Sequence, residues 1–393
     1  QLQTHKLDVG YLLSVPSLGQ VTAGAEINGN GLNSNINSRV NLLASEIYFN
    51  KYNYTNLSAN FILKNKEIQG EASLKDTNIE MAISGLIDLD ENNTKYIIKI
   101  NVKGADLHEL HFTESDLSIG IIAEVDLKGN SATTLNGDAG ISQVTLAKDG
   151  KVHILDTLIF ATINEQGKNN IDFSSAVLNL KYAGTIPITT LTKSLLNHLN
   201  NYFPLTQKEN QDTTNYPGRF DLTVKIKPHP VIREVFLPSL SSYDIEPFLI
   251  TFDGPNKTLK SNLHINNLEY DNISISNLTI DVNSDISHLE YKISGSDIIY
   301  NNYELRDLLI DGQIADSSIS TNISVQNQNK EKLLAMHSIM QQEKLLTKLH
   351  IIPEELILAG KSWTIDSSNY TGFNQKGILF HNLTLNNASH KIS

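Results

Sequence analysis

The side chains best suited to chemistry in this sequence are a pair of histidines. His108 and His111 stand three residues apart in the sequence HELH, without the four-residue spacing that places two histidines on one face of a zinc-protease helix. In a strand, residues three apart point to opposite faces. We therefore expect solvent-facing histidines and no shared metal ion.

A second candidate is a short acidic run. Asp88, Asp90 and Asn92 imitate the start of a calcium-binding loop. Such a loop needs glycine at its sixth position and glutamate at its twelfth, where this sequence has Asn93 and Lys99. A hairpin turn is the better interpretation.

The remaining polar residues do not indicate catalysis. The chain of 393 residues has no cysteine, which excludes thiol nucleophiles and disulfides. It has no GxSxG, P-loop or GxGxxG motif. Carboxylates alternate with apolar residues, as on a solvated sheet face, and no pair stands out for acid–base work. We expect a protein that is not an enzyme and holds no metal and no cofactor.

Charge and hydropathy exclude further classes. A net charge of -12 argues against binding to nucleic acid and against electrostatic adsorption to an anionic bilayer. No apolar run approaches the ~18 residues of a transmembrane helix, and no signal peptide is present. The chain begins QLQTHKLDVG and ends ASHKIS, so we expect a mature or internal segment of a longer protein.

Most of the sequence shows period-two alternation, which is typical of strands with one apolar and one wet face. In 117–127, Ile119, Ile121 and Val125 point one way, while Glu124 and Asp126 point the other. Comparable rows begin at Ile79, Tyr96, Phe220 and Ile319.

Turn dipeptides separate these strands. Asp149-Gly150 is the pair that a two-residue type I′ hairpin requires. Asn136-Gly137, Asp253-Gly254 and Asp311-Gly312 are expected to be turns of the same chemistry. Short strands joined by tight turns predict an antiparallel meander.

A loose repeat of Asn-Leu or Asp-Leu is expected to open strands. Its first residues are Asn56, Asp116, Asn277, Asp307 and Asn382. Within 273–282 the alternation breaks at Ser276-Asn277 and resumes out of phase, which predicts a β-bulge. The irregular spacing argues against a solenoid of fixed period.

One stretch, 188–204, reads as an amphipathic helix that ends at Pro204, with Thr189 or Thr190 as its cap. Its apolar face comprises Ile188, Leu191, Leu195, Leu199 and Tyr202, and its polar face Lys193, Ser194, Asn197, Asn200 and Asn201. Such a helix either packs on a sheet or lies as a plug across an open apolar groove.

These elements suggest two β segments, 1–187 and 218–393, on either side of the helix at 188–205 and a polar loop at 206–217. The strand rows leave more apolar face than one helix can cover. Either the sheet folds on itself into a dry sandwich, or it curls into a trough that ligand fills. The pattern by itself favours the sandwich, because unfilled apolar grooves are rare.

Two stretches carry a family resemblance. In 356–385 a Gly-Lys-X-Trp-Thr-Ile-Asp sequence leads to an asparagine, a glycine turn and an Asn-Leu strand. In 174–205 an alternating strand, a glycine and the helix follow one another. The matching residues of the first stretch are Gly360, Lys361, Trp363, Thr364, Ile365, Asp366, Asn369, Gly377, Asn382 and Leu383. The chain resembles the TamB-like proteins of Bacteroidetes, in the AsmA-like superfamily, and outside these stretches is similar to them only in texture.

The resemblance implies an all-β fold: an elongated, curved antiparallel sheet (a β-taco, or U-shaped groove) with one short amphipathic helix near the middle. It implies a periplasmic segment that bridges the inner and outer membranes of a Gram-negative bacterium and conducts phospholipids, with a role in outer-membrane protein assembly. Implied partners are a TamA-like outer-membrane barrel of the BamA superfamily and an inner-membrane anchor outside this segment. The alternative is an elongated scaffold or adhesin-like module with a dry core.

With this resemblance the trough is favoured over the sandwich. The expected groove wall is Ile98, Ile100, Ile119, Ile121, Val125, Leu222, Val224, Ile226, Ile273 and Ile275, with ordinary dry core as the alternative for each. Leu191, Leu195 and Leu199 are expected to cap or narrow the groove, and Trp363 to be a packing anchor. The segment 330–349 is rich in helix formers, yet we favour two strands with a turn at Gln342-Glu343.

Overall fold

A computed structural model describes residues 1–31, 35–90, 94–131, 134–204, 218–301, 303–343, 346–388 and 390–392. Strands dominate this part of the chain and pair antiparallel in an open sheet, with a short amphipathic helix near the middle of the sequence. The predicted all-β fold class is therefore confirmed.

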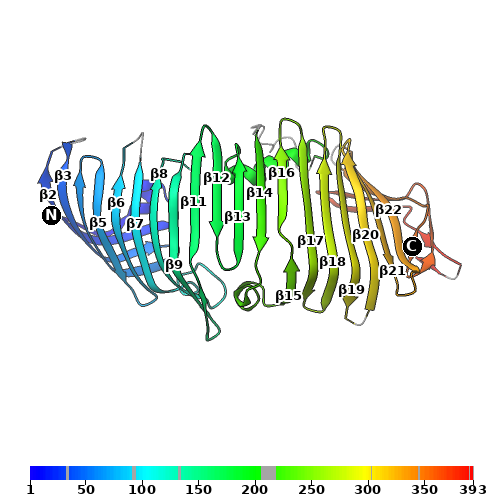
Figure 1. Ribbon diagram of the computed structural model, residues 1–393, viewed down its shortest axis with the longest axis horizontal. Coiled ribbons are helices and arrows are strands. Elements are labelled where there is room, and N and C mark those ends of the chain that lie inside the picture. The colour runs from blue at the N-terminus through cyan, green and yellow to red at the C-terminus, as the bar shows by residue number, and fades with distance from the viewer. Residues whose placement is uncertain are drawn as a thin grey trace. The chain divides into compact units, whose positions relative to one another are not determined.

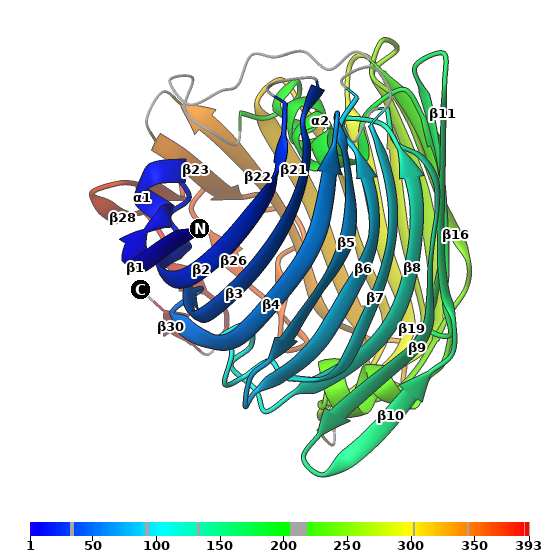
Figure 2. The same ribbon diagram turned by 90° about the vertical axis from the view of Figure 1, so that its left-hand side faces the viewer.

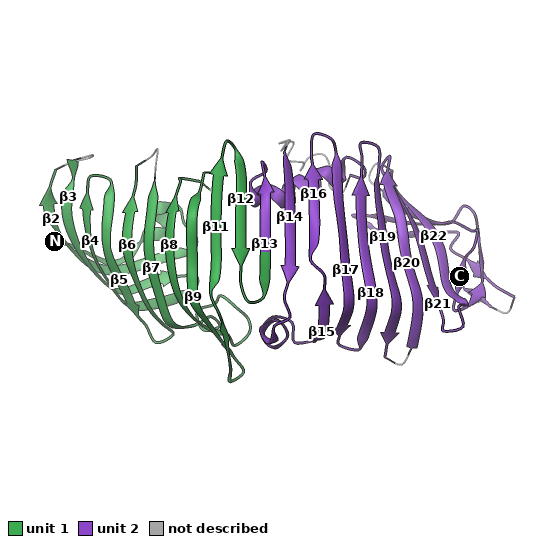
Figure 3. Cartoon of the chain, in the orientation of Figure 1, with its two compact units in different colours: residues 1–179 green, residues 180–393 purple. Residues whose placement is uncertain are grey.

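The chain divides into two compact units, Gln1–Asn179 and Leu180–Ser393 (Figure 3). The division falls inside β13 (Leu178–Gly184), earlier than the predicted loop. The helix of 188–205 therefore belongs to the second unit, and the loop of 206–217 lies outside the described residues.

Unit 1 is a meander in which each strand from β1 to β9 pairs with the next (Figure 1). Its elements are β1 (Leu2–Asp8), α1 (Val9–Leu13), β2 (Leu18–Asn30), β3 (Asn37–Phe49), β4 (Tyr52–Lys64), β5 (Glu67–Lys75), β6 (Ile79–Asp88), β7 (Lys95–Asp106), β8 (Ser118–Lys128), β9 (Asn136–Lys148), β10 (Lys151–Leu155), β11 (Leu158–Glu165) and β12 (Lys168–Ser174). β9 pairs with both β10 and β11 beyond it. The strands of this unit curve along their length (Figure 2).

Unit 2 repeats the antiparallel pattern and adds helices. Its elements are η2 (Ile188–Thr190), α2 (Leu191–Asn200), β14 (Arg219–Ile226), η4 (Ile232–Phe236), β15 (Leu240–Ile245), β16 (Phe248–Asp253), β17 (Thr258–Tyr270), β18 (Ile273–Ser284), β19 (Leu289–Tyr300), β20 (Tyr303–Ala315), β21 (Ser318–Gln326), β22 (Lys332–Glu343), β23 (Leu346–Ile351), β24 (Ile357–Leu358), β25 (Lys361–Ser362), β26 (Thr364–Ile365), β27 (Tyr370–Asn374), β28 (Gly377–His381), β29 (Leu385–Asn386) and β30 (Lys391–Ile392). Strands β26, β29 and β30 form a separate small sheet.

The prediction of two strands for 330–349 is confirmed by β22 and β23. Its turn was misplaced, because Gln342 and Glu343 pair with Thr347 and Leu346 inside the ladder. Residues 344–345, between the two strands, lie outside the described residues. Cross-strand packing of Met336 and Met340 with Ile323 and Ile319 outweighs the helical propensity of this segment.

The turn predictions were right in part. Asp149 and Gly150 both adopt positive φ, 50° and 74°, between the paired Lys148 and Lys151, as a type I′ turn requires. Asp253-Gly254 begins a longer connection to β17. Asn136-Gly137 and Asp311-Gly312 are not turns but lie within β9 and β20.

Three of the five Asn-Leu and Asp-Leu dipeptides do not open strands as predicted, whereas Asp116-Leu117 directly precedes β8. Asn56, Asn277 and Asp307 lie inside β4, β18 and β20, with φ of 57°, 50° and 48°. Asparagine and aspartate tolerate this left-handed conformation better than other residues. Each such residue interrupts the alternation, so that Tyr54 and Leu57, three apart around Asn56, both pack in one apolar cluster. The β-bulge predicted at Ser276-Asn277 is wrong: Asn277 is a left-handed kink, but the register of β18 with β17 and β19 does not shift there.

Candidate functional site

The strand register of unit 1 aligns apolar side chains in rows that run from strand to strand. Because paired residues share a face, each row follows directly from the pairing. One row is Ala25, Leu42, Ala59, Ala72, Ile83, Ile100, Ala123 and Ile141. The rows beside it are Ala23, Ala44, Leu57, Leu74, Met81, Val102, Ile121 and Val144, and Val40, Phe61, Gly70, Gly85, Ile98, Val125 and Ala139. We call these rows the apolar face of unit 1.

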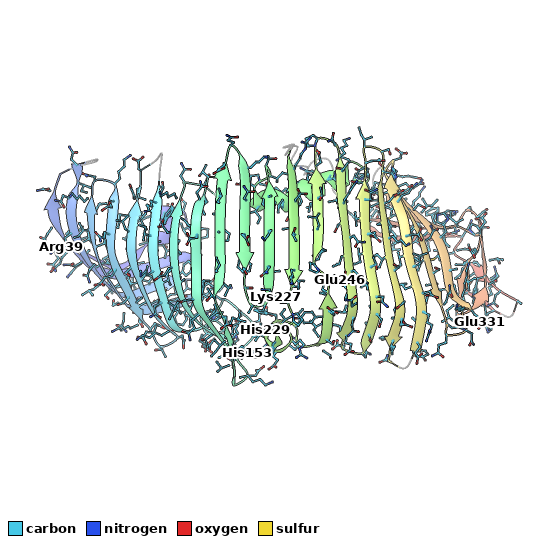
Figure 4. All side chains as sticks on the ribbon, in the orientation of Figure 1. Arg39, His153, Lys227, His229, Glu246 and Glu331 are labelled. Atoms are coloured by element: carbon cyan, nitrogen blue, oxygen red, sulfur yellow. The ribbon has the colours of Figure 1, made fainter. Side chains whose placement is uncertain are left out.

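The other face of the same strands is polar. Asn60, Glu71, Ser84, Lys99 and Glu124 lie on it in register, and Lys99 Nζ lies 2.8 Å from Glu124 Oε1. Side chains project from both sides of the strands (Figure 4). Arg39, labelled there, lies on the polar face, where it pairs with Ile62. The charged side chains named here therefore share one face of unit 1, and the three apolar rows share the other.

All the groove residues predicted in unit 1 lie on its apolar face. Ile98, Ile100, Ile121 and Val125 belong to the three rows, and Ile119 lies beside them, paired with Ala105 and Leu146. Each of the five is half-buried.

One side of the apolar face is covered. The connection from β7 to β8 places Leu110, 1% exposed, against Tyr54, Leu74 and Ala105. Ile119 packs against the same cluster, as do Leu57, Met81 and Val102 of the second row. These residues therefore belong to a closed core, and the first and third rows lie outside it.

Hydrogen bonds fix this covering connection. Asp106 Oδ1 accepts bonds from the backbone N–H groups of His108 and Glu109, each at 3.1 Å. The Asn50 side chain donates to the carbonyl of His111 at 3.0 Å. His108 and His111 are therefore exposed residues of a turn and do not lie in the strand that we expected.

The acidic run beside β6 is a hairpin connection in its described part. Asp88 pairs with Lys95, and Asp88 Oδ1 accepts a bond from the Asp90 N–H at 3.0 Å. Asn92 and Asn93 lie outside the described residues. In the described part of the chain no three His, Asp or Glu side chains converge on a possible metal site.

Unit 2 carries its own apolar rows. One is Leu263, Ile280, Ile293, Ile310, Ile323 and Met336, and another is Leu268, Ile275, Ile298 and Leu305. Among the predicted residues, Leu222, Val224 and Ile226 alternate with polar residues along β14 and are half-buried. Ile275 lies in the second row of unit 2. Ile273 is the first residue of β18 and is 37% exposed.

The helix lies over the strand ends of unit 2. The line of residues that it buries there differs from the predicted one. Its buried residues are Ser194 and His198, and Tyr202 follows one turn later, 3% exposed. Leu191, Leu195 and Leu199 flank this line and are half-buried. Ser194 had been assigned to the polar face, but its hydroxyl donates to the Thr190 carbonyl at 3.1 Å and needs no water.

Polar contacts hold the helix in place. His198 Nε2 lies 2.9 Å from Ser284 Oγ at the end of β18. The Tyr202 hydroxyl donates to the Lys257 carbonyl at 3.1 Å, and Ser317 N–H donates to the Tyr202 carbonyl at 2.8 Å. Thr190 occupies the N-cap position, as one of the two predicted alternatives, but its hydroxyl donates to the Pro187 carbonyl and makes no capping bond.

His198 packs in a column of buried aromatic rings. Its ring meets Phe252 and Tyr202 edge-on, at 5.2 Å each, and Phe252 packs on Phe220 at 5.4 Å. Burial, with a smaller effect from the Lys257 charge, lowers the pKa of His198 to about 4. The imidazole is therefore neutral at pH 7.

The tryptophan motif is structural. Asn369, 1% exposed, accepts a bond from the Ile351 N–H at 3.0 Å and donates to the Ile351 and Asp366 carbonyls at 2.7 Å. Trp363 Nε1 donates to the Leu358 carbonyl at 3.2 Å. These bonds anchor the motif to β23, in agreement with the packing role expected of Trp363.

Two surface hollows lie on the polar faces of the strands. A hollow of about 460 Å³ in unit 1 is lined by Asn60, Glu71, Lys99 and Glu124. One of about 580 Å³ in unit 2 is lined by Asp281, Lys292, Asp311 and Asn322. Their walls are side chains that bond to one another, so we regard them as spaces within a solvated surface. The apolar faces are the better candidate sites.

Comparisons with known proteins add no identity. No family model, curated protein or solved structure matches this chain. Among the described helices, none is long and apolar enough to cross a bilayer.

Sequence reasoning missed the cover over the apolar face and the ring column. The burial of Leu110 could not be predicted from its neighbours in the sequence, because HELHF shows no periodic pattern of apolar residues. The buried face of the helix was predicted wrongly, because leucine is on average buried more often than histidine or serine. The prediction therefore placed the leucines, rather than the histidine and the serine, on the buried side.

Proposed function

We propose that this chain is a non-enzymatic lipid-binding and lipid-conducting segment. Acyl chains of phospholipids would lie against the apolar faces, and head groups would remain in water. The observation that carries this proposal is the apolar face of unit 1: three aligned rows across β2–β9, without a polar side chain, whose residues are mostly half-buried.

Such a surface holds acyl chains without specific polar contacts. Each buried methylene contributes about 0.8 kcal/mol of transfer free energy. Because neighbouring positions along a row are all apolar or glycine, the binding free energy changes little from one strand to the next. A bound chain can therefore move along a row.

The resemblance to TamB-like proteins supplies the wider setting of the proposal. In it, the segment carries phospholipid across the periplasm of a Gram-negative bacterium and contributes to outer-membrane protein assembly. A TamA-like barrel of the BamA superfamily is the proposed outer-membrane partner, and an anchor elsewhere in the parent protein reaches the inner membrane.

Two neighbouring residues of β8 provide a matched test. Ile121 is half-buried on the apolar face, whereas Ile122 is 40% exposed on the opposite face. Native mass spectrometry with lipid extraction should find phospholipid on the purified protein, strongly reduced by Ile121→Glu and retained by Ile122→Glu.

Circular dichroism of both variants reports whether they fold. A folded Ile121→Glu protein with undiminished lipid contradicts the proposal. A stable, lipid-free wild-type protein whose Ile121→Glu variant unfolds favours the alternative of a scaffold with a dry core, because a buried unpaired carboxylate is strongly destabilising.

A further inference from the structure

Three Asn-Gly dipeptides of unit 1 share one chemical reactivity. They are Asn28-Gly29, Asn30-Gly31 and Asn136-Gly137. Where glycine follows asparagine, no Cβ screens the backbone nitrogen of the glycine, so this nitrogen can approach the carboxamide carbon Cγ of the asparagine. Whether the two atoms react depends on how firmly the fold holds the asparagine side chain and the backbone beside it.

The reaction is a deamidation whose only co-reactant is water. At Asn30, the Gly31 nitrogen would give up its proton to solvent hydroxide and form a bond to Cγ. The Cγ–Nδ2 bond breaks, and ammonia leaves with a proton taken from water. Water then opens the five-membered succinimide. Hydrolysis at Cγ gives aspartate, and hydrolysis at the main-chain carbonyl carbon gives isoaspartate; nothing is oxidised or reduced.

Asn30-Gly31 is the least constrained of the three dipeptides. β2 and β3 lie side by side at the blue end of unit 1 (Figure 1), and the pair of Asn30 with Asn37 is the last of their ladder. Asn30 is exposed. Within the part of the chain that the structure describes, its carboxamide makes no hydrogen bond. Both the side chain and the following backbone are therefore free to reach the reactive geometry.

The fold itself requires the glycine that makes this dipeptide reactive. Gly31 has a φ of 85°, in the region that favours glycine. A Cβ at residue 31 would lie 2.0 Å from the Asn35 carbonyl oxygen. A larger residue would block the reaction but would not fit here.

Asn136 lies in the same cross-strand row as Asn30, yet it is held by its side chain and its backbone. Its Oδ1 accepts a bond from the Asn164 N–H at 2.5 Å, and its Nδ2 donates to the Thr134 carbonyl at 2.9 Å. Gly137 pairs with residues of both β8 and β11. The carboxamide would have to give up both bonds before it could react.

Asn28-Gly29 is exposed but lies inside the ladder. Arg39 and Ser38 pair with its two residues. The strands approach so closely that a Cβ at residue 29 would lie 2.4 Å from the Asn37 carbonyl oxygen. The backbone there cannot rotate toward the carboxamide without breaking strand pairs, so we expect slower reaction than at Asn30.

We propose that Asn30 is a deamidation site of the folded protein, and that the sheet protects Asn28 and Asn136. The modification adds one negative charge at the end of β2 to a chain whose net charge is already -12. The proposal goes beyond the lipid-conducting function and does not depend on it, because Asn30 belongs to none of the three apolar rows.

Peptide mapping by mass spectrometry tests the proposal on the folded whole chain, incubated at mildly alkaline pH in water labelled with heavy oxygen. Each succinimide that opens takes up one labelled oxygen, which separates conversion during the incubation from earlier conversion. Asn30 should convert at least about tenfold faster than Asn136, because Asn136 must first break two side-chain hydrogen bonds. The rate at Asn28 should lie between these two.

The urea-unfolded chain supplies the reference, because all three dipeptides lose their structure in it and should then convert at similar rates. Asn30→Gln should remove conversion at residue 30, since glutamine would have to close a six-membered ring, and should leave the other two rates unchanged. If Asn30 keeps its amide in the folded protein, or if Asn28 or Asn136 converts as fast as Asn30, the proposal is wrong.

Discussion

Asp76 joins two hairpins of unit 1 through its carboxylate. The Tyr52 hydroxyl donates to Oδ1 at 2.6 Å, and the Thr55 backbone N–H and hydroxyl donate to Oδ2 at 2.9 and 2.7 Å. Although burial opposes ionisation, these bonds and one from the Asn78 N–H lower the pKa of Asp76. Burial, strengthened by Asp76, raises the pKa of Tyr52 to about 12.

We expect Asp76→Asn to destabilise this part of unit 1 by about 1–3 kcal/mol, because donors lose a charged acceptor. Since the folded pKa lies below the unfolded one, the stabilisation is present above about pH 4 and is lost as pH falls through the folded pKa. Hydrogen exchange of β4–β6 measures the effect. Asp126→Asn is the control, because Asp126 is 56% exposed and 3.9 Å from Lys95. Equal protection in both variants would contradict this role.

At the scale of elements, α2 is held by a neutral histidine. A folded-state pKa of about 4 for His198 lies below the ~6.5 of an unfolded chain. The unfolded state therefore binds the proton first as pH falls. His198 contributes full stability above about pH 6.5 and loses it between there and about pH 4.

We expect the free energy of unfolding of unit 2 to fall by up to about 3 kcal/mol over that interval. Trp363 fluorescence during urea unfolding reports on this unit. His198→Gln should flatten the pH dependence, whereas His111→Gln, an exposed position of unit 1, should leave it unchanged. An unaltered slope in His198→Gln would mean that other groups cause the acid sensitivity.

For the whole molecule, the proposed lipid binding is apolar and does not depend on charge. At 1 M salt the Debye length shrinks to about 3 Å, which screens charge–charge attraction. Phospholipid should therefore remain bound to the protein in 1 M NaCl. Lipid released by salt, as measured after gel filtration, would indicate that the rows are not its binding site.

Period-two patterning predicted the all-β architecture and the apolar face of each strand. It did not predict the kinks within strands or the segments that pack over the apolar face. Ile98, Ile100 and Val125 could be placed because alternation and pairing are both local. Asn56 and Asp307 were misread as strand openings, since a left-handed residue within a strand leaves no mark on composition. Leu110 and His198 were missed because long-range contacts decide their burial.

The same pairing constrains how the chain can change in length. One residue added to β6 or β7 would turn every side chain beyond it to the other face, placing carboxylates and lysines among the rows. Substitution among aliphatic residues should thus be tolerated far more readily than insertion or deletion within these strands. Growth or loss of unit 1 is therefore compatible with the rows by whole hairpins.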